Sequence, residues 1–309
     1  MDKKIMALLV ISLFVLVGCT KDQVSTSMSK AFIGGTDAVE FDFVEGSPPA
    51  EVYDGGSYPF EVALNVENKG EYDVAKENIT IELAGFYPAD FSLTQESIIK
   101  NPEEDLERSQ IEAEGNIIPG TVTYVTFPRF NFTSSLSANN EYKIRANVCY
   151  VYGTKAQADI CILDDLTKSN DKVCKVTEQK TVHSSSGPIQ IEGLEESIAG
   201  TDRVTFSFEV VHRGSGAISQ KETDCSDETI GRNKVWVEVN NNLTGLECSG
   251  LSDGTATTGF TTLYSGKRMI RCTQPTDNLQ GDFEKKVKIS AVYDYKEHKQ
   301  VDLVVKHTT

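Results

Sequence analysis

The sequence predicts an all-β protein, with two tandem β-sandwich domains that follow a lipoprotein signal peptide and a short tether. Three observations lead to this prediction. Apolar and polar residues alternate in short runs that end at turn residues, which is typical of antiparallel sheets with one buried face. A pattern of residues recurs about 143 positions further along the chain, and a short apolar leader ends at Cys19. The repeat indicates one domain fold used twice, and the leader indicates export.

The first 18 residues have the features of an export signal. Lys3 and Lys4 precede an apolar run over residues 5–17, which is shorter than the roughly 20 residues of a membrane-spanning helix. The run closes on Leu16-Val17-Gly18-Cys19, which resembles the lipobox of secreted lipoproteins. In such proteins the cysteine thiol carries a diacylglyceryl group, and two acyl chains hold a protein stably in a bilayer.

We therefore expect Cys19 to be lipidated and the protein to be anchored to the outer face of the cytoplasmic membrane. Two alternatives remain open. One is simple secretion after cleavage near Gly18, and the other is an uncleaved leader that serves as a weak membrane anchor.

Residues 19–31 are predicted to form the lipidated cysteine and a flexible tether, because this stretch is polar, rich in Ser and Thr, and lacks periodicity. The rest of the chain divides at the turn-rich segment 184–188. This division gives a first domain over residues 32–183 and a second over residues 188–309, in keeping with the usual size of a domain.

The first domain is predicted to be mostly strand. One helix is expected near Asn101–Gln110, where Asn101 could cap the helix and Pro102 could occupy its first position. A long strand is expected over residues 144–152. Its core face would carry Ile144, Ala146, Val148, Tyr150 and Tyr152, whereas Cys149 would point outward.

The repeat supports the division into two domains. Residues 141–152 align without a gap with residues 284–295, so Tyr293 and Tyr295 correspond to Tyr150 and Tyr152. A repeat of this length is a whole domain rather than a solenoid unit. Each copy is predicted to end on a hairpin, with the first turn at residues 153–157. Upstream, Val62, Leu64, Val66 and Gly70 align with Phe206, Phe208, Val210 and Gly214 at an offset of 144.

Once Cys19 is committed to a thioether, six cysteines remain, an even number that suits disulfides in an oxidising exterior. Their spacings match neither a zinc ribbon nor a zinc finger, so no metal or cofactor is expected. The candidates for disulfide bonds are Cys149, Cys161, Cys174, Cys225, Cys248 and Cys272.

Two pairings compete in the first domain. Cys149 would lie opposite Cys161 across the predicted hairpin, or Cys161 would pair with Cys174. Cys248 and Cys272 are expected on sequential strands of the second domain. Cys225 would then be either unpaired or bonded to the cysteine of the first domain that the chosen pairing leaves free.

Two segments carry a resemblance to known families. Pro59–Gly70, followed by the alternating aliphatics of Ile79–Leu83, resembles the start of CARDB-type immunoglobulin-like modules. Cys149–Thr154, with Cys161 and Cys174 after it, is similar to two-module surface lipoproteins of archaea. Over residues 32–305 the resemblance implies immunoglobulin-like β-sandwiches. Such modules serve as spacers, adhesins and carriers, and a fold of this kind does not by itself supply an activity.

The charge of the chain argues against a nucleic-acid partner, and its lack of catalytic motifs argues against an enzyme. The net charge of -16 repels phosphate backbones. The chain has no GxSxG motif, and no histidine lies in an HExxH or CxxCH motif. The sequence therefore predicts no catalytic, cofactor-binding or metal-binding residue. The four histidines, which we interpret as surface residues, are His183, His212, His298 and His307.

Three Asn-x-Thr sequons are possible glycosylation sites, at Asn78, Asn131 and Asn242. Together these observations predict a non-enzymatic, lipid-anchored surface protein whose tandem modules serve binding, adhesion or structural spacing. Its expected partners are the membrane, through the lipid, and an extracellular protein or glycan. The alternative is an accessory or substrate-presenting subunit of a membrane complex for transport or secretion.

Overall fold

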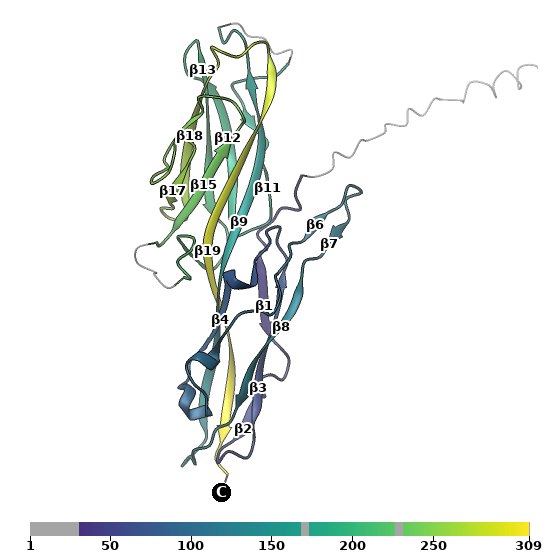
Figure 1. The fold of residues 1–309 in the computed structure, drawn as a ribbon, viewed down its shortest axis with the longest axis vertical. Coiled ribbons are helices and arrows are strands. Elements are labelled where there is room, and N and C mark those ends of the chain that lie inside the picture. The colour runs from purple at the N-terminus through teal and green to yellow at the C-terminus, as the bar shows by residue number, and fades with distance from the viewer. Residues whose placement is uncertain (1–30, 168–172, 226–230, 309) are drawn as a thin grey trace, which may run out of the picture.

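The computed structural model describes residues 31–167, 173–225 and 231–308, which form two β-rich lobes arranged end to end (Figure 1). The all-β prediction is confirmed, because the described residues contain strands, turns and three short 3₁₀ helices and no α-helix. These 3₁₀ helices are η1 (Lys76–Asn78), η2 (Pro88–Phe91) and η3 (Glu96–Ile98). No helix in this part of the chain is long and apolar enough to cross a membrane.

The helix expected near Asn101–Gln110 is wrong. Leu106 lies in extended backbone and exchanges two hydrogen bonds with Val74, at 3.0 and 2.8 Å. The carboxylate of Asp105 accepts a hydrogen bond from the backbone N–H of Lys76. The segment therefore satisfies its polar groups laterally, against residues 70–76, instead of within a helix.

Lobe 1 pairs a three-stranded sheet with part of a larger sheet. The three-stranded sheet has the order β1-β3-β8, and alternate residues of its central strand β3 are fully buried, including Val62, Leu64 and Val66. A small hairpin, β6 with β7, extends beside it. The strands named are β1 (Val39–Phe43), β3 (Phe60–Asn68), β6 (Gln110–Ile111), β7 (Ile117–Ile118) and β8 (Val122–Phe130).

Lobe 2 contains a five-stranded sheet of the order β10-β12-β13-β18-β16. Its central strand β13 buries Phe206, Phe208 and Val210, the residues that align with the core of β3. The two copies therefore share their core positions, as the repeat predicts. The strands are β10 (Gln179–Lys180), β12 (Ile189–Ile198), β13 (Arg203–His212), β16 (Glu247–Ser249) and β18 (Lys267–Pro275).

A nine-stranded sheet joins the lobes through two long strands, β9 (Asn140–Ile162) and β19 (Phe283–Lys306). They pair antiparallel without a register shift, from Ile162 opposite Phe283 to Asn140 opposite Val305, and run through both lobes (Figure 1). In lobe 1 they are flanked by β2 (Glu51–Tyr53), β4 (Ile79–Ala84) and β5 (Ile99–Lys100), and in lobe 2 by β11 (His183–Ser184), β14 (Ala217–Ser219), β15 (Lys234–Asn240) and β17 (Thr258–Thr262).

The predicted hairpins at the ends of the two copies are therefore wrong. Residues 153–157 lie in the middle of β9, where Gly153 pairs with Val292 and the ladder continues on both sides. The predicted boundary at residues 184–188 does not separate the lobes either. Lobe 1 is completed by the second half of β19, and lobe 2 by the second half of β9. Each copy of the repeat thus gives half of a strand to the other lobe.

The register shows that this exchange is symmetric. Adding 143 to the residue number on β9, and subtracting 143 on β19, turns the cross-strand pair Tyr150–Tyr295 into the pair Tyr293–Tyr152. The same operation turns Val151 into Asp294, which is its own cross-strand partner. Cross-strand ion pairs obey the same rule, because Lys143–Asp302 maps onto Lys286–Asp159. The two copies are thus related by a local two-fold axis that passes between Val151 and Asp294.

All six predicted cysteines form disulfides, which indicates an extracellular or otherwise oxidising environment. Cys161 pairs with Cys174, so the alternative pairing of Cys161 with Cys149 is wrong. Cys149 and Cys161 lie on one continuous strand and cannot meet. Cys225 bonds to the remaining Cys149, and Cys248 bonds to Cys272, which lies opposite it on a neighbouring strand.

Candidate functional site at the lobe junction

Four tyrosines pack around the two-fold axis, and each is at most 1% exposed, which confirms their predicted place in the core. The rings of Tyr150 and Tyr295 are 5.8 Å apart, and those of Tyr152 and Tyr293 are 6.3 Å apart. Burial raises the pKa of all four phenols, so the hydroxyl groups remain neutral.

The tyrosine hydroxyl groups hold the loops that meet at the junction. The backbone N–H of Gly216 donates to the Tyr295 hydroxyl at 2.7 Å, and that of Ile189 donates to the Tyr293 hydroxyl at 3.2 Å. Gly214 lies so close to Tyr295 that a Cβ atom would overlap its hydroxyl group. The aligned Gly70 lies in the same way against Tyr152. The two aligned glycines are thus explained by close packing against equivalent tyrosines.

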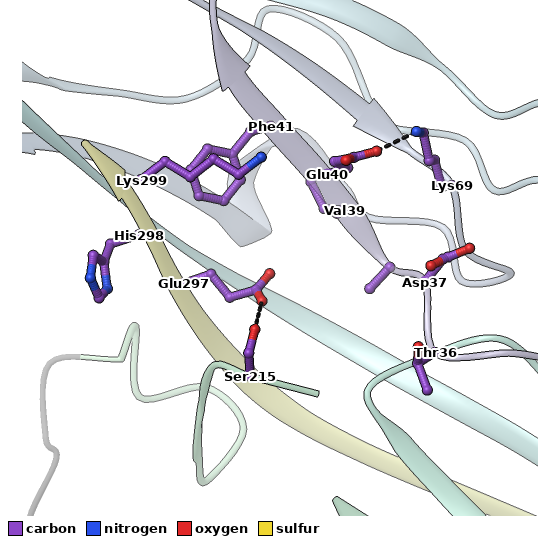
Figure 2. Close-up of a pocket in the computed structure, with 11 residues that line it drawn as sticks. Thr36, Asp37, Val39, Glu40, Phe41, Lys69, Ser215, Glu297, His298 and Lys299 are labelled. Carbon is purple, nitrogen blue, oxygen red and sulfur yellow. Dashed lines mark hydrogen bonds and ion pairs between the residues drawn. The ribbon is translucent and has the colours of Figure 1, made fainter. Parts of the chain in front are cut away.

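A crevice opens where the loop 213–217 of lobe 2 meets β1 and β19. Three neighbouring hollows of about 450, 540 and 330 Å³ all border Ser215 and Glu297. Figure 2 shows the first of them, with Glu297 reaching toward Ser215 from β19 and His298 turned away from both. We call these three hollows together the junction crevice. Both lobes contribute to its walls.

Glu297 is the central charged group of the junction crevice. Its carboxylate accepts hydrogen bonds from the Ser215 hydroxyl at 3.2 Å and from the Tyr150 hydroxyl at 3.4 Å. Burial raises the pKa of Glu297, and these two hydrogen bonds and the charge of Lys299 offset part of that rise. The carboxylate is thus held in place by a partner from each lobe.

Paired charges bridge β19 and the opposite wall of the crevice, which β1 forms. Lys299 forms an ion pair with Asp42 at 2.7 Å and lies 5.7 Å from the ring centre of Phe41. Lys69 pairs with Glu40 at the rim (Figure 2). Such a lining suits the binding of a polar or mixed surface.

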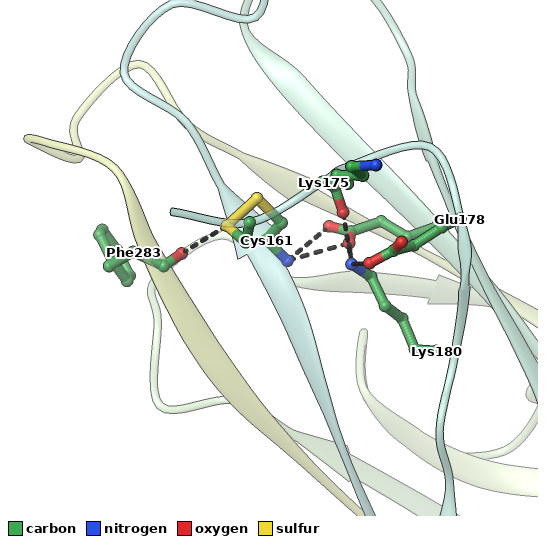
Figure 3. Close-up of polar contacts among 7 residues, drawn as sticks. Cys161, Lys175, Glu178, Lys180 and Phe283 are labelled. Atoms are coloured by element: carbon green, nitrogen blue, oxygen red, sulfur yellow. Dashed lines mark hydrogen bonds and ion pairs between the residues drawn. A yellow bond between two sulfur atoms is a disulfide. The ribbon is translucent and has the colours of Figure 1, made fainter. Parts of the chain in front are cut away.

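A second polar cluster lies beneath the Cys161–Cys174 disulfide in lobe 2 (Figure 3). Both carboxylate oxygens of Glu196 accept the backbone N–H of Cys161, at 3.0 and 2.9 Å, and Lys180 lies 3.3 Å away. The Glu196 side chain is fully buried, and burial raises its pKa to about 7. At the aligned position in lobe 1, the N–H of Val304 bonds to the carbonyl of Ala50. The Glu196 carboxylate therefore takes the place of a backbone carbonyl as the acceptor for this N–H group, which is a structural role.

The buried Glu196 should make stability depend on pH. Because its folded pKa of about 7 lies above the ordinary 4.5, the folded state keeps its proton where the unfolded state has lost it. The free energy of unfolding should then fall, by on the order of 2–3 kcal/mol, as pH rises from 4.5 to 7. Glu196→Gln should remove this part of the slope, as measured by urea unfolding at a series of pH values. An unchanged slope would show that Glu196 is already ionised at pH 5.

The three predicted glycosylation sites differ in their exposure to solvent. Asn78 and Asn242 are exposed, beside β4 and after β15, so a glycan has room there. Asn131 is half-buried, and its side-chain oxygen is buried without a partner. Asn131 is therefore the poorest acceptor of the three. Cys19 and the predicted signal peptide lie outside the described residues.

The histidines occupy unrelated places. His212 is half-buried, with Nε2 3.2 Å from the Tyr295 hydroxyl, and burial lowers its pKa. His307 contacts Asp54 at 3.0 Å, His183 lies in β11, and His298 is exposed. Within the described residues, no group of three or more His, Cys, Asp or Glu side chains is placed to hold a metal ion.

Ser215 and Glu297 are not among the site residues predicted from the sequence. One signal could have found Glu297: it follows Tyr293 and Tyr295 at a spacing of two, so it is an acid on the core face of a strand. The aligned residue of the first copy is Thr154, which is uncharged.

Comparisons with known proteins assign no family. No family model and no curated protein matches the chain. The collagen-binding domain of the Erysipelothrix rhusiopathiae surface protein RspB aligns with 89% of this chain and 91% of its own, at 8% identity and a TM-score of 0.11. A similarity of this size supports no conclusion about fold or function.

Proposed function

We propose that this chain is a non-enzymatic, lipid-anchored surface protein that presents the junction crevice as a binding surface between two immunoglobulin-like lobes. The observation that carries the proposal is the pair of continuous strands, β9 and β19, which belong to both lobes. Domains joined by an ordinary linker move relative to each other by default. Here the shared strands keep the two walls of the crevice in a fixed relation, as a preformed binding surface requires.

Other features favour the same role. The three disulfides suit an exposed location outside the cytoplasm, and the leader up to Cys19 resembles that of a lipoprotein. The resemblance to CARDB-type modules is in keeping with proteins that bind or space partners on surfaces. The partner class that fits is an extracellular protein or glycan.

The anchoring part of the proposal is tested by Cys19→Ser. The variant should move from the membrane fraction to the soluble or secreted fraction and should lose the incorporation of a labelled fatty acid, because its hydroxyl cannot form the thioether. Thr20→Ala, one residue further on, is the matched control and should stay in the membrane fraction. Lipid anchoring is wrong if the Cys19→Ser protein remains as firmly membrane-bound as the wild type.

A role as accessory subunit of a membrane complex is favoured by one observation. Several apolar side chains of lobe 1 are exposed on or beside β7 and β8: Ile117, Ile118, Val122 and Tyr124, at 58, 46, 49 and 62%. A stoichiometric partner that co-purifies with the membrane-extracted wild type, but not with Tyr124→Glu, would favour this second function.

A further inference from the structure

One edge of β19 lacks a strand partner over a short stretch. On one side β19 pairs with β9 over nearly its whole length. On the other side it pairs with β15, then with β14 up to Lys296, and again with β2 from Val304. Between these two points, residues 297–303 have no strand beside them within the described parts of the chain. We call this stretch the open lane.

The backbone of the open lane is oriented to receive a strand. The N–H of Val304 points away from β9, because it donates to the carbonyl of Ala50 at 3.0 Å. Backbone direction alternates along a strand, and β9 and β19 pair without a register shift. His298, Gln300 and Asp302 therefore present their N–H and C=O groups to the lane, and all three residues are exposed.

The other lobe shows what fills the equivalent lane. The offset of 143 residues places His298 over Lys155 and Gln300 over Gln157. In lobe 2 the segment β11 pairs antiparallel with Gln157, and the next residue, Ser185, donates its N–H to the carbonyl of Lys155 at 2.7 Å. The same edge of the sheet is thus covered in one copy of the repeat and open in the other.

We propose that the open lane takes up a short, extended, acidic segment of a partner polypeptide as an added antiparallel strand. Addition of a strand to an exposed edge is a common mode of peptide recognition. A second copy of this chain cannot pair here through its own β19. That strand continues beyond the lane in both directions and would collide with β14 and β2, which occupy the lane's two ends. The occupant must therefore be about seven residues that enter and leave the sheet.

The charge at the end of the lane next to β14 favours an acidic segment. The largest hollow of the junction crevice, of about 540 Å³, lies beside the lane and is lined by Arg145, Lys296 and His298. This basic lining is unusual on a chain with a net charge of -16. Among the described residues that line the hollow, the acid is Glu297, and its carboxylate is bonded to Ser215 and Tyr150. Every second side chain of an added strand would lie on the same face of the sheet as this hollow. Acidic residues at the end of the strand near Lys296 and His298 would therefore meet the basic groups.

This inference rests on the proposed binding function and names the partner class. Its test uses the purified full chain with end-capped, fluorescent seven-residue peptides, and is therefore independent of membrane anchoring. One peptide alternates Glu with Val, a second has Lys in place of Glu, and a third has Pro at its centre. Binding is followed by fluorescence polarisation, and protection of residues 297–303 by hydrogen exchange.

The Glu peptide should bind and should slow amide exchange in residues 297–303 about tenfold or more. The Lys and Pro peptides should bind at least about tenfold more weakly. Gln300→Pro should abolish binding, because proline removes the central N–H of the lane while the bonds to β9 remain. Gln300→Ala, at the same position, keeps that N–H and should bind as the wild type does. Arg145→Glu should weaken binding, whereas Arg129→Glu, an exposed arginine on β8, should not.

Three results would overturn the proposal: no binding of the Glu peptide at millimolar concentration, equal binding of the Glu and Lys peptides, or binding that survives Gln300→Pro. Thermal melting of each variant shows whether it remains folded. If Gln300→Pro does not fold, the exchange rates of the wild type with and without the Glu peptide decide the matter. A membrane-bound protein that fails to bind the Glu peptide would refute this inference and leave the anchoring proposal in place.

Discussion

Residues 32–183 and residues 188–309, expressed separately, should each fail to fold. The first fragment lacks the second half of β19, which supplies Leu303 and Val305 to the core of lobe 1, both fully buried. Burial of one large apolar side chain is worth about 1.5–3 kcal/mol. The loss of two such residues, on the order of 3–6 kcal/mol, is a large part of the whole stability of a typical domain. The second fragment likewise lacks Ala158 and Ile160 of β9.

Circular dichroism and thermal melting measure this outcome. Neither fragment should show a cooperative transition, whereas an equimolar mixture of the two should recover one, because together they contain every strand except Ser184 of the two-residue β11. The uncut chain over residues 32–309 is the control and should show a cooperative transition, because it keeps both halves of β9 and β19. A cooperative melt of either fragment by itself would mean that the exchanged half-strands are dispensable.

Loss of the Cys149–Cys225 disulfide should lower stability more than loss of any other. It joins a strand shared by the lobes to the loop between β14 and β15, over a sequence separation of 76. The chain-entropy relation gives about 4 kcal/mol for a loop of this size. The fold should survive in Cys149→Ser/Cys225→Ser, because Asp294 still holds the loop through the N–H groups of Glu222 and Thr223.

Urea unfolding under oxidising and reducing conditions checks this expectation. The matched control is Cys248→Ser/Cys272→Ser, which removes a loop of separation 24 and should cost about 3 kcal/mol. All three proteins should become equally stable once reduced. If Cys149→Ser/Cys225→Ser loses less stability than Cys248→Ser/Cys272→Ser, the junction is held mainly by the shared strands and not by this disulfide.

The residues predict the fold only in part, and the tyrosines and Gly153 show why. Alternation along each strand identifies the buried tyrosines, because one face of the sheet must be apolar. Gly153, in contrast, indicates a turn in the sequence, whereas in the structure it makes room for the ring of Tyr72. That reason is invisible without the tertiary contact. The aligned Lys296 of the second copy, which does not favour a turn, was the available sign that the strands continue.

The junction crevice and the open lane depend on relations that one sequence does not reveal. Glu297 could be noticed as an acid on a core face. Its partners Ser215 and Tyr150, however, come from 82 and 147 positions away. The lane exists because β14 begins at Ala217, opposite Lys296, and β2 begins at Glu51, opposite Val304. Pairing register between distant segments is set by the assembled fold rather than by local pattern.

The exchange of half-strands is tested most directly by a chain that makes lobe 1 contiguous. Residues 36–152, a two-residue Asn-Gly turn and residues 293–308 would join Tyr152 to its cross-strand partner Tyr293 as a hairpin, with Cys149→Ser to remove the unpaired thiol. This chain should melt cooperatively and show slow amide exchange along both strands, although residues 32–183 do not. If the hairpin-joined chain remains unfolded while residues 32–183 fold alone, the lobes do not exchange strands and the account is wrong.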